Sequence, residues 1–473
     1  MVIGRARRPW SQLAAAVKGM VVIVAGLLLA ACATYTARPL SREAVATALA
    51  PRRATPYWAA RAHLLLPRLP VLTIHKGEGL TPDLAAVVAV VADPRLRALR
   101  AREAVAGAEL LSAGLLPNPR FSYGIGVPIS GAGLSKAFRV GLGLSIRSLV
   151  TRKARLRAAR YHSQAVGLMV AWQEWQVAAR AKALVYELLV GRREKRLLTR
   201  EVRALRRSVE LLSDAEAAGY ATIGVAGAAR LTLRETEMAR LAIRRNCALK
   251  GLQLRALLGV SARSPLFLQR GSIAGRFVKP VPPALWLTGL AHRRLDLVAL
   301  RRGYQSQDAA LRAAIAGQFP AITIGIDRAR DTSDINTLGG GVSVSLPIFN
   351  HNQGRIAVAR ATRRLLFRTY VARLYAARTE IHHLLMAMYY QRLEIRGVRS
   401  SVRALTHLEA VYHQALARDR IAALTYYQLL GRAMAERLLL LKDEARLAQL
   451  GVALEAASGR FDWPKAAKKG AVT

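Results

Sequence analysis

The sequence predicts a mainly α-helical fold with a small β part, built from a duplicated unit of helix, β-hairpin and long helical hairpin. Three observations support this prediction. None of the 18 prolines lies within residues 129–264 or 348–463, and both stretches are rich in Ala, Leu, Arg and Glu, which favour helices. Four short segments alternate apolar with small or polar residues. Similar segments recur about 200 residues apart along the chain.

The first predicted helix begins at Thr81-Pro82-Asp83, where an N-cap is followed by proline at the first helical position. Asp93-Pro94 marks a bend or a restart. The helix then continues to Leu116 and stops at Pro117-Asn118-Pro119. Its first part has apolar residues at helical spacing, namely Leu84, Val87, Val88 and Val91.

A period of two predicts strands at about 121–127, 138–146, 322–327 and 338–346, each with one apolar face and one small or polar face. In an exported protein, such strands are typical of a membrane barrel with lipid outside and water inside. A half-buried soluble hairpin is the alternative, and the local pattern favours neither.

The two proline-free stretches predict long helices, each with one reversal. A helix from about 150 to 217 would be roughly 100 Å long at 1.5 Å per residue. The reversals fall at 218–224 and at 418–421. Apolar residues at alternating spacings of four and three predict coiled-coil seams, namely Leu198, Val202, Leu205, Val209 and Leu212, then Ile395, Val398, Val402 and Leu405.

The duplication sets the predicted domain boundaries. Ala113–Pro117 aligns with Ala316–Pro320, and Val140 aligns with Val342. The first repeat is predicted at 81–264 and the second at 265–460. Residues 32–80 are expected to form an extended N-terminal arm, and 461–473 a disordered tail.

The N-terminus resembles a bacterial lipoprotein signal. A basic segment precedes the apolar run Met20–Ala31, and Leu29-Ala30-Ala31-Cys32 resembles a lipobox. Residues 1–31 are therefore predicted to be a signal peptide, with Cys32 as the lipidated residue. Ala33 then favours the outer membrane. The alternatives are an ordinary signal peptide with a chance cysteine, or an uncleaved anchor.

Composition excludes several classes of protein. The chain has 473 residues, a net charge of +44, 52% hydrophobic residues and two cysteines. The charge suggests nucleic acid or an anionic membrane, and export argues against nucleic acid. Two cysteines exclude a disulfide scaffold, and Cys247 is expected to be buried and structural. We find no catalytic motif and no phosphate-binding loop, so we predict no enzyme and no cofactor.

Assembly follows from the strand count. Four strands cannot close a barrel, and an open sheet edge in hydrocarbon leaves unpaired backbone groups. If these strands lie in a membrane, several copies must therefore pool them, and a trimer would supply twelve. The arginine-rich helical hairpins cannot lie in the membrane, so they must project into the periplasm.

This pattern resembles the TolC family of outer-membrane efflux proteins over nearly the whole mature chain. The stretches that carry the resemblance are Leu80–Pro119, with its Pro-Asn-Pro entry to the first strand, and Ser345–Ala359 (SLPIFNHNQGRIAVA). The second is most like the CzcC-like subgroup that serves heavy-metal resistance-nodulation-division (RND) pumps. The resemblance implies a homotrimer with a 12-stranded outer-membrane β-barrel continued by a periplasmic α-helical barrel.

The resemblance also implies partners and cargo. The trimer would dock on a periplasmic membrane-fusion (adaptor) protein and an inner-membrane RND pump, forming a passive export duct. The subgroup implies heavy-metal cations as cargo, although basic walls fit such cargo poorly. A multidrug or type I secretion duct of the same fold is one alternative. An outer-membrane-anchored periplasmic coiled-coil scaffold is another.

In that family the helical reversals contact the adaptor, and charged residues near the second reversal help to close the pore. By position, the docking tips are Gly219, Tyr220 and Gly224 in the first reversal and Ile421 in the second. The gate residues are Arg418, Asp419 and Arg420. The second reversal lacks the glycine that usually opens it in the family. A solvated helix end with ordinary charges is the alternative.

Histidines raise the question of a metal site. His351 stands alone, and the adjacent His382 and His383 point to different faces of a helix. We therefore predict no metal site.

Overall fold

The computed structural model describes residues 35–49, 79–131, 134–269, 277, 280, 282–418 and 420–460. The predictions for the signal peptide, Cys32, Asp419 and the tail lie outside these residues. The chain divides into two units, Met1–Pro51 and Arg52–Thr473.

The first unit contains helix α2 (Arg42–Leu49). Ser41 Oγ accepts a hydrogen bond from Ala44 N at 3.2 Å. The arm was expected to be extended, and this difference arises because a capping serine precedes a run of good helix formers.

In the second unit, the predicted break in the first helix is confirmed. Helix α4 (Pro82–Ala92) ends where helix α5 (Pro94–Gly114) begins. Thr81 Oγ1 accepts a hydrogen bond from Leu84 N at 3.0 Å, as an N-cap does. Asp93 caps α5 in the same way, accepting from Arg95 N at 2.8 Å.

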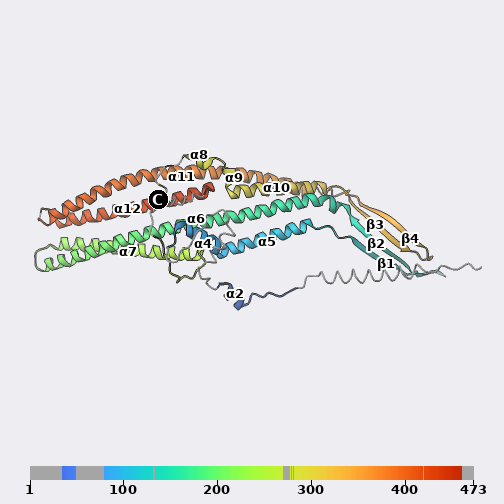
Figure 1. The fold of residues 1–473 in the computed structure, drawn as a ribbon, viewed down its shortest axis with the longest axis horizontal. Coiled ribbons are helices and arrows are strands. Elements are labelled where there is room, and N and C mark those ends of the chain that lie inside the picture. Colours follow the sequence, from blue (N-terminus) through green and yellow to red (C-terminus); the bar gives the residue numbers. More distant parts are fainter. Residues whose placement is uncertain are drawn as a thin grey trace, which may run out of the picture. The chain divides into compact units, whose positions relative to one another are not determined.

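The four predicted strands form one antiparallel sheet in the order β1-β2-β3-β4. The strands are β1 (Arg120–Gly126), β2 (Ala137–Ser145), β3 (Ala321–Arg330) and β4 (Asn336–Ser345). Strands β2 and β3 join the two halves of the chain, with Leu142 opposite Ile326 and Leu144 opposite Ile324. The hairpins of the two repeats therefore lie side by side in one sheet (Figure 1).

Each hairpin leads into a long helix. Helix α6 (Ile146–Ala217) has 72 residues and helix α11 (Gln353–Leu416) has 64. At 1.5 Å per residue, α6 is about 108 Å long. Helices α7 (Ile223–Leu257) and α12 (Ala423–Ser458) return alongside α6 and α11, respectively, as Figure 1 shows.

Before the second hairpin come three shorter helices, namely α8 (Pro283–Leu287), α9 (Leu290–Arg293) and α10 (Leu295–Ala316). Helix α10 packs against both α6 and α11, and α5 packs against α6. The order of a broken helix, hairpin, long helix and return helix is thus repeated, and the predicted duplication is confirmed.

The two repeats also share a detail at their helix junctions. Gly259, with a φ of +60°, lies against Ala92 where α4 ends, and Gly459, with a φ of +67°, lies against Arg293 where α9 ends. In both places a left-handed glycine ends the return helix at the point where a preceding helix breaks. Only glycine adopts this conformation without strain and allows so close an approach.

The main hydrophobic core lies where the four long helices come together, near the middle of α6 and α11 and towards the C-terminal ends of α7 and α12. It includes Leu184 and Val185 on α6, Leu254 on α7, Ile381 on α11 and Leu447 on α12. Further along α6, the predicted seam residues Leu198, Val202 and Leu205 are buried. Cys247 is half-buried, with its Sγ against Gly191 of α6, and burial raises the pKa of its thiol.

Candidate functional site

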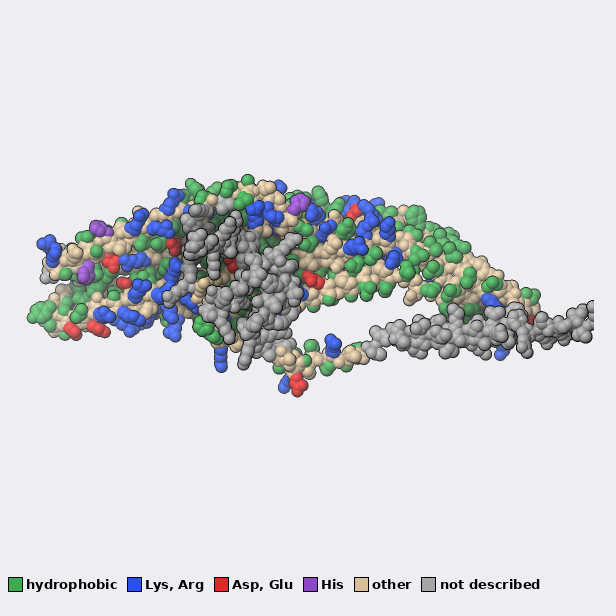
Figure 2. All heavy atoms as spheres, in the orientation of Figure 1, with side chains coloured by type: hydrophobic (Ala, Val, Ile, Leu, Met, Phe, Trp, Pro, Cys, Tyr) green, Lys and Arg blue, Asp and Glu red, His purple; other side chains and the backbone are tan. Residues whose placement is uncertain are grey.

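One face of the sheet is apolar and exposed. Phe121 pairs with Leu142, which pairs with Ile326, and Leu144 pairs with Ile324, which pairs with Val342. These side chains share a face because period-two alternation is in register across all four strands. Phe121 is 66% exposed and Val342 is 69% exposed. Figure 2 shows hydrophobic side chains gathered over this part of the molecule. An exposed apolar surface of this kind is typical of a contact with a membrane or with another protein.

The opposite face carries small and polar residues. Ser122 pairs with Gly141, and Thr323 pairs with Ser343. Arg139 and Asp327 also lie on this face, with Arg139 Nε 3.9 Å from Asp327 Oδ2. This face suits contact with water.

The sheet has two open edges, because β1 and β4 each pair on one side only within the described residues. Their outer backbone groups are available to strands of another copy. Within the described residues, no helix combines the length and the apolar character needed to cross a membrane.

At the far end of the long helices, the first tip is closed by glycine. Tyr220 N donates to Ala215 O at 2.7 Å and Gly219 N donates to Glu216 O at 3.1 Å. This is the hydrogen-bond pattern of a Schellman cap, in which Gly219, with a φ of +76°, takes the left-handed position. Tyr220 is 89% exposed. Gly224 lies exposed in the first turn of α7, which Thr222 caps.

Replacing Gly219 with alanine is expected to destabilise the first tip by roughly 1–2 kcal/mol, because an L-residue is strained in the left-handed region. Gly227→Ala is the matched control, since Gly227 lies inside α7 with open space around it; it is expected to stabilise the helix by roughly 0.5–1 kcal/mol. Hydrogen exchange of residues 213–225 measures both effects. Equal exchange rates in the two variants would contradict this account of the turn.

The second tip closes differently. Arg418 N and Arg420 N both donate to Ala415 O, at 3.2 and 2.9 Å. The φ of Arg418 is not in the left-handed region, unlike that of Gly219 at the first tip. Both arginines are exposed, Ile421 is half-buried, and the third predicted gate residue, Asp419, lies outside the described residues. The two tips therefore combine apolar and basic exposed groups.

Behind the tips, the two hairpins are held together by an aromatic cluster. Tyr427 of α12 is buried with Leu205 of α6 and Ala229 of α7. The ring of Tyr426 lies 5.7 Å from that of Tyr427 and 6.0 Å from that of His413. This cluster fixes the position of one tip relative to the other.

A carboxyl group with a raised pKa lies beside this cluster. Burial raises the pKa of Glu201 on α6, and the carboxylate of Glu409 on α11 raises it further, whereas Arg437 on α12 lowers it. Arg437 Nη2 itself donates to Glu409 Oε2 at 2.6 Å. The pKa of Glu237, which is half-buried on α7, is instead lowered by its hydrogen bond with Arg206.

These two carboxyl groups are expected to give opposite pH dependences. Because the pKa of Glu201 is raised on folding, its ionised carboxylate destabilises the folded state at high pH. This destabilisation fades as the pH falls towards the pKa of a glutamate in the unfolded chain, about 4.3. Glu201→Gln should therefore raise the melting temperature at pH 8 and leave it unchanged near pH 4. Glu237→Gln should lower the melting temperature at pH 8, with no effect once the pH is below the native pKa. Changes of the same sign at pH 8 would refute this assignment.

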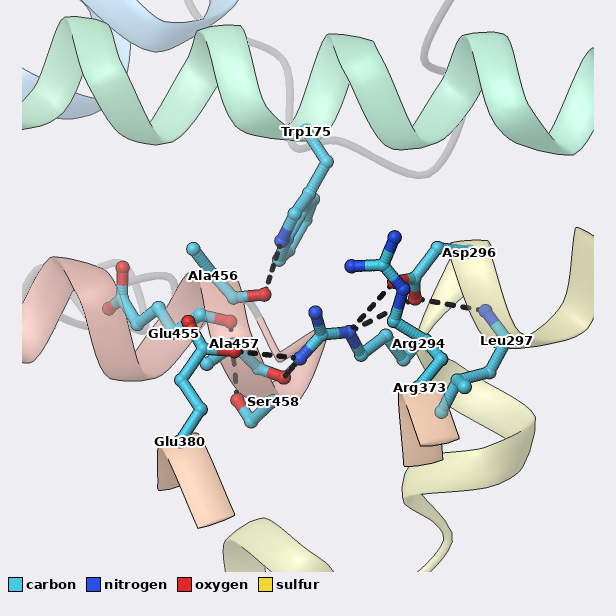
Figure 3. A network of polar contacts seen from close by, with 10 residues as sticks. All are labelled: Trp175, Arg294, Asp296, Leu297, Arg373, Glu380, Glu455, Ala456, Ala457 and Ser458. Atoms are coloured by element: carbon cyan, nitrogen blue, oxygen red, sulfur yellow. Dashed lines mark hydrogen bonds and ion pairs between the residues drawn. The ribbon is translucent and has the colours of Figure 1, made fainter. Parts of the chain in front are cut away.

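The middle of the body contains a buried polar network (Figure 3). Arg294 Nε lies 3.0 Å from Asp296 Oδ1, and its Nη1 lies 3.1 Å from Glu380 Oε2 and 3.0 Å from Ala457 O. The Arg294 guanidinium also lies 4.8 Å from the ring centroid of Trp172. Trp175 Nε1 donates to Ala456 O at 3.1 Å. The network ties the last turn of α12 to α6, α10 and α11.

A second buried group lies nearby. Lys182 of α6 is 1% exposed, and its Nζ lies 2.9 Å from Asp83 Oδ1 of α4 and 2.7 Å from Glu455 Oε2 of α12. Sequence reasoning did not single out Lys182 or Arg294. The available signal was the scarcity of acidic residues, since 29 Asp and Glu face 73 Lys and Arg. Each carboxylate therefore has many possible basic partners.

The histidines remain separate. His382 and His383 are adjacent and exposed on α11, and His351 is exposed before it. Among the described residues, no group of three His, Cys, Asp or Glu side chains is placed to hold a metal ion.

This architecture, a four-stranded sheet with an exposed apolar face continued by long helical hairpins, is the TolC-type channel fold predicted from the sequence. Solved structures with the same fold include CusC, from a study of transmembrane channel formation, at 15% identity and a TM-score of 0.68 over 82% of this chain and 96% of that chain. The outer-membrane channel OprN has 15% identity and a TM-score of 0.67, over 80% of this chain and 90% of that chain. The outer membrane protein VceC of Vibrio cholerae has 16% identity and a TM-score of 0.65, over 80% of this chain and 96% of that chain.

No family model matches the chain, and no curated protein matches it. At these low identities, the likeness to the solved structures concerns the fold.

Proposed function

We propose that this protein is the outer-membrane channel subunit of a tripartite RND-type efflux system and acts as a passive export duct without chemistry of its own. One observation carries the proposal. The sheet has an exposed apolar face on one side and small or polar residues on the other, with open edges at β1 and β4. Lipid would cover the first face, and water would fill the space behind the second.

The open edges support a homotrimer. Four strands cannot close a barrel, whereas three copies supply twelve, which is within the range of known outer-membrane barrels. Strand β1 of one copy would pair with β4 of the next, so that no edge is left in hydrocarbon. The helices would continue the barrel as a periplasmic tube, with residues 81–264 and 265–460 as its two repeats.

The tips would contact a periplasmic adaptor protein. Tyr220 and the neighbouring Ile223 are strongly exposed apolar residues at the first tip, and an exposed apolar cluster of this kind is typical of a protein contact. Gly219, Gly224 and Ile421 complete the proposed docking surface. Arg418, Asp419 and Arg420 are proposed as the gate.

The N-terminus would anchor the protein to the outer membrane through a lipid on Cys32, after removal of residues 1–31. For the cargo, the Ser345–Ala359 stretch favours heavy-metal cations, and the basic helices favour drugs or other cargo instead. Growth of a deletion strain on zinc, copper and a panel of drugs separates these cargoes. Sensitivity to metals alone supports heavy-metal cations as the cargo, and sensitivity to drugs alone supports drugs.

Planar-bilayer recording tests the channel itself. The purified full-length protein is expected to be a trimer and to conduct ions when added to a bilayer. The rival function is a lipid-anchored periplasmic scaffold in which the sheet is a soluble hairpin pair. A scaffold would be silent in the bilayer, and silence from a well-folded preparation would reject the channel.

A further inference from the structure

Two stretches of the chain that lie next to the sheet contain no acidic residues. Residues 110–173 and 335–379 contain no Asp or Glu, yet they contain nine and seven Lys or Arg, respectively. The first stretch covers β1, β2 and the start of α6, and the second covers β4 and the start of α11. Acidic partners for these cations can therefore come only from other segments, as Asp327 does for Arg139 and Asp308 for Arg363.

Most cations in these segments also lack acidic partners. Within the described part of the chain, most exposed cations at the starts of α6 and α11 contact no carboxylate, among them Lys153, Arg157, Arg160, Arg355, Arg360 and Arg364. Towards the tips, by contrast, arginines pair with acids, as Arg206 does with Glu237 and Arg437 with Glu409. We call these six residues the basic collar. They form a surface suited to an anionic partner.

A cleft lies beside the collar. It has a volume of about 1090 Å³ and lies between the starts of α6 and α11 and the end of α10. Arg147 and Arg355 are its charged lining residues, and Asn350 and Gln353 add amide groups. Asn352, with a φ of +67°, fixes the turn before α11 by donating from Nδ2 to Ala314 O at 2.6 Å. Two guanidinium groups and several amides match the chemistry of a phosphate ester.

Apolar side chains continue from the mouth of the cleft to the sheet. Phe349 lines the cleft and is 91% exposed, and Leu346 and Ile348 are exposed between it and the end of β4. A soluble anion would gain nothing from these residues. A lipid would gain from both parts, because its phosphate fits the arginines and its acyl chains fit the apolar surface.

We infer that this cleft binds the headgroup of an anionic phospholipid of the periplasmic leaflet, with the basic collar as the surrounding electrostatic surface. Arg147 and Arg355 hold the phosphate, the Asn350 amide binds the glycerol oxygens, and Phe349 contacts the acyl chains. The inference rests on the proposed function, which places the sheet in the membrane. Basic residues near an anionic membrane surface strengthen binding, so removing two of them is expected to weaken it by roughly tenfold or more.

The test uses the full-length protein in nanodiscs of phosphatidylcholine alone and of an equal mixture with phosphatidylglycerol. Native mass spectrometry then counts the retained lipids. We expect wild type to retain phosphatidylglycerol preferentially and Arg147→Gln/Arg355→Gln to lose this preference roughly tenfold or more. Arg147→Lys/Arg355→Lys keeps the charge and should retain most of the preference, which shows that the site tolerates substitution.

The matched control is Arg396→Gln/Arg403→Gln, which removes two exposed arginines of α11 outside the acid-free stretches. It should bind phosphatidylglycerol like wild type. Equal loss in both double variants would overturn the site, as would complete displacement of the lipid by millimolar inorganic phosphate. Conductance in phosphatidylcholine bilayers separates the hypothesis of a lipid site from that of a channel. A conducting wild type without lipid preference would overturn the lipid site alone, whereas the absence of conductance in every lipid would overturn the channel.

Discussion

Replacing Lys182 with methionine is expected to destabilise the protein by about 3–5 kcal/mol, because the change breaks a buried ion pair by removing one partner. Its Nζ lies between Asp83 and Glu455, which come from helices at opposite ends of the chain. Without the ammonium group, the two carboxylates repel each other in a site that excludes water. Denaturant unfolding in detergent measures the change in free energy.

The control for this prediction is Lys250→Met. Lys250 Nζ lies 2.7 Å from Glu187 Oε2, but the lysine side chain is 27% exposed, so water replaces much of what is lost. Its cost should be at most about 1 kcal/mol, as for surface ion pairs. Adding Asp83→Asn and Glu455→Gln to Lys182→Met should recover part of the stability. Equal losses for Lys182→Met and Lys250→Met would contradict the structural role of Lys182.

Placing an arginine at Ile324 should prevent insertion of the sheet into a membrane. Ile324 lies on the apolar face, between Leu144 and Val342. An arginine on the lipid face costs about 2–4 kcal/mol at the bilayer midplane, and a trimer would bear this cost three times. Flotation with liposomes and bilayer conductance measure the loss.

Ser343→Arg is the matched control on the opposite face of the sheet. Ser343 is exposed on the neighbouring strand and pairs with Thr323. There the arginine would meet water, so insertion should be kept and only the conductance or its ion selectivity should change. If Ser343→Arg abolished insertion as strongly as Ile324→Arg, the assignment of the two faces would be wrong.

The local features of the fold followed from the sequence because their signals are local. Thr81 and Pro82 mark a helix start through a hydrogen bond and a fixed dihedral angle, and Gly219 marks a reversal through its free φ. The predicted strands were too short at the loop end of the second hairpin. Arg328 continues β3 opposite Val140, but a charged residue in an apolar series breaks the alternation on which the prediction rested.

The long-range contacts could not be predicted in this way. Lys182 lies 273 residues from Glu455 in the sequence, and neither position has a distinctive neighbour that indicates the pairing. Arg294 likewise belongs to a junction of four helices, which exists only once the two repeats have packed together. The cleft at Arg147 and Arg355 is a further example, because its two arginines come from corresponding places in different repeats.

The most direct test of the channel is single-channel recording from a chemically cross-linked, purified oligomer. The account predicts a three-chain particle that conducts ions in a planar bilayer and an Ile324→Arg variant that does not insert. A folded protein that stays monomeric and produces no conductance under the same conditions would contradict the central claim.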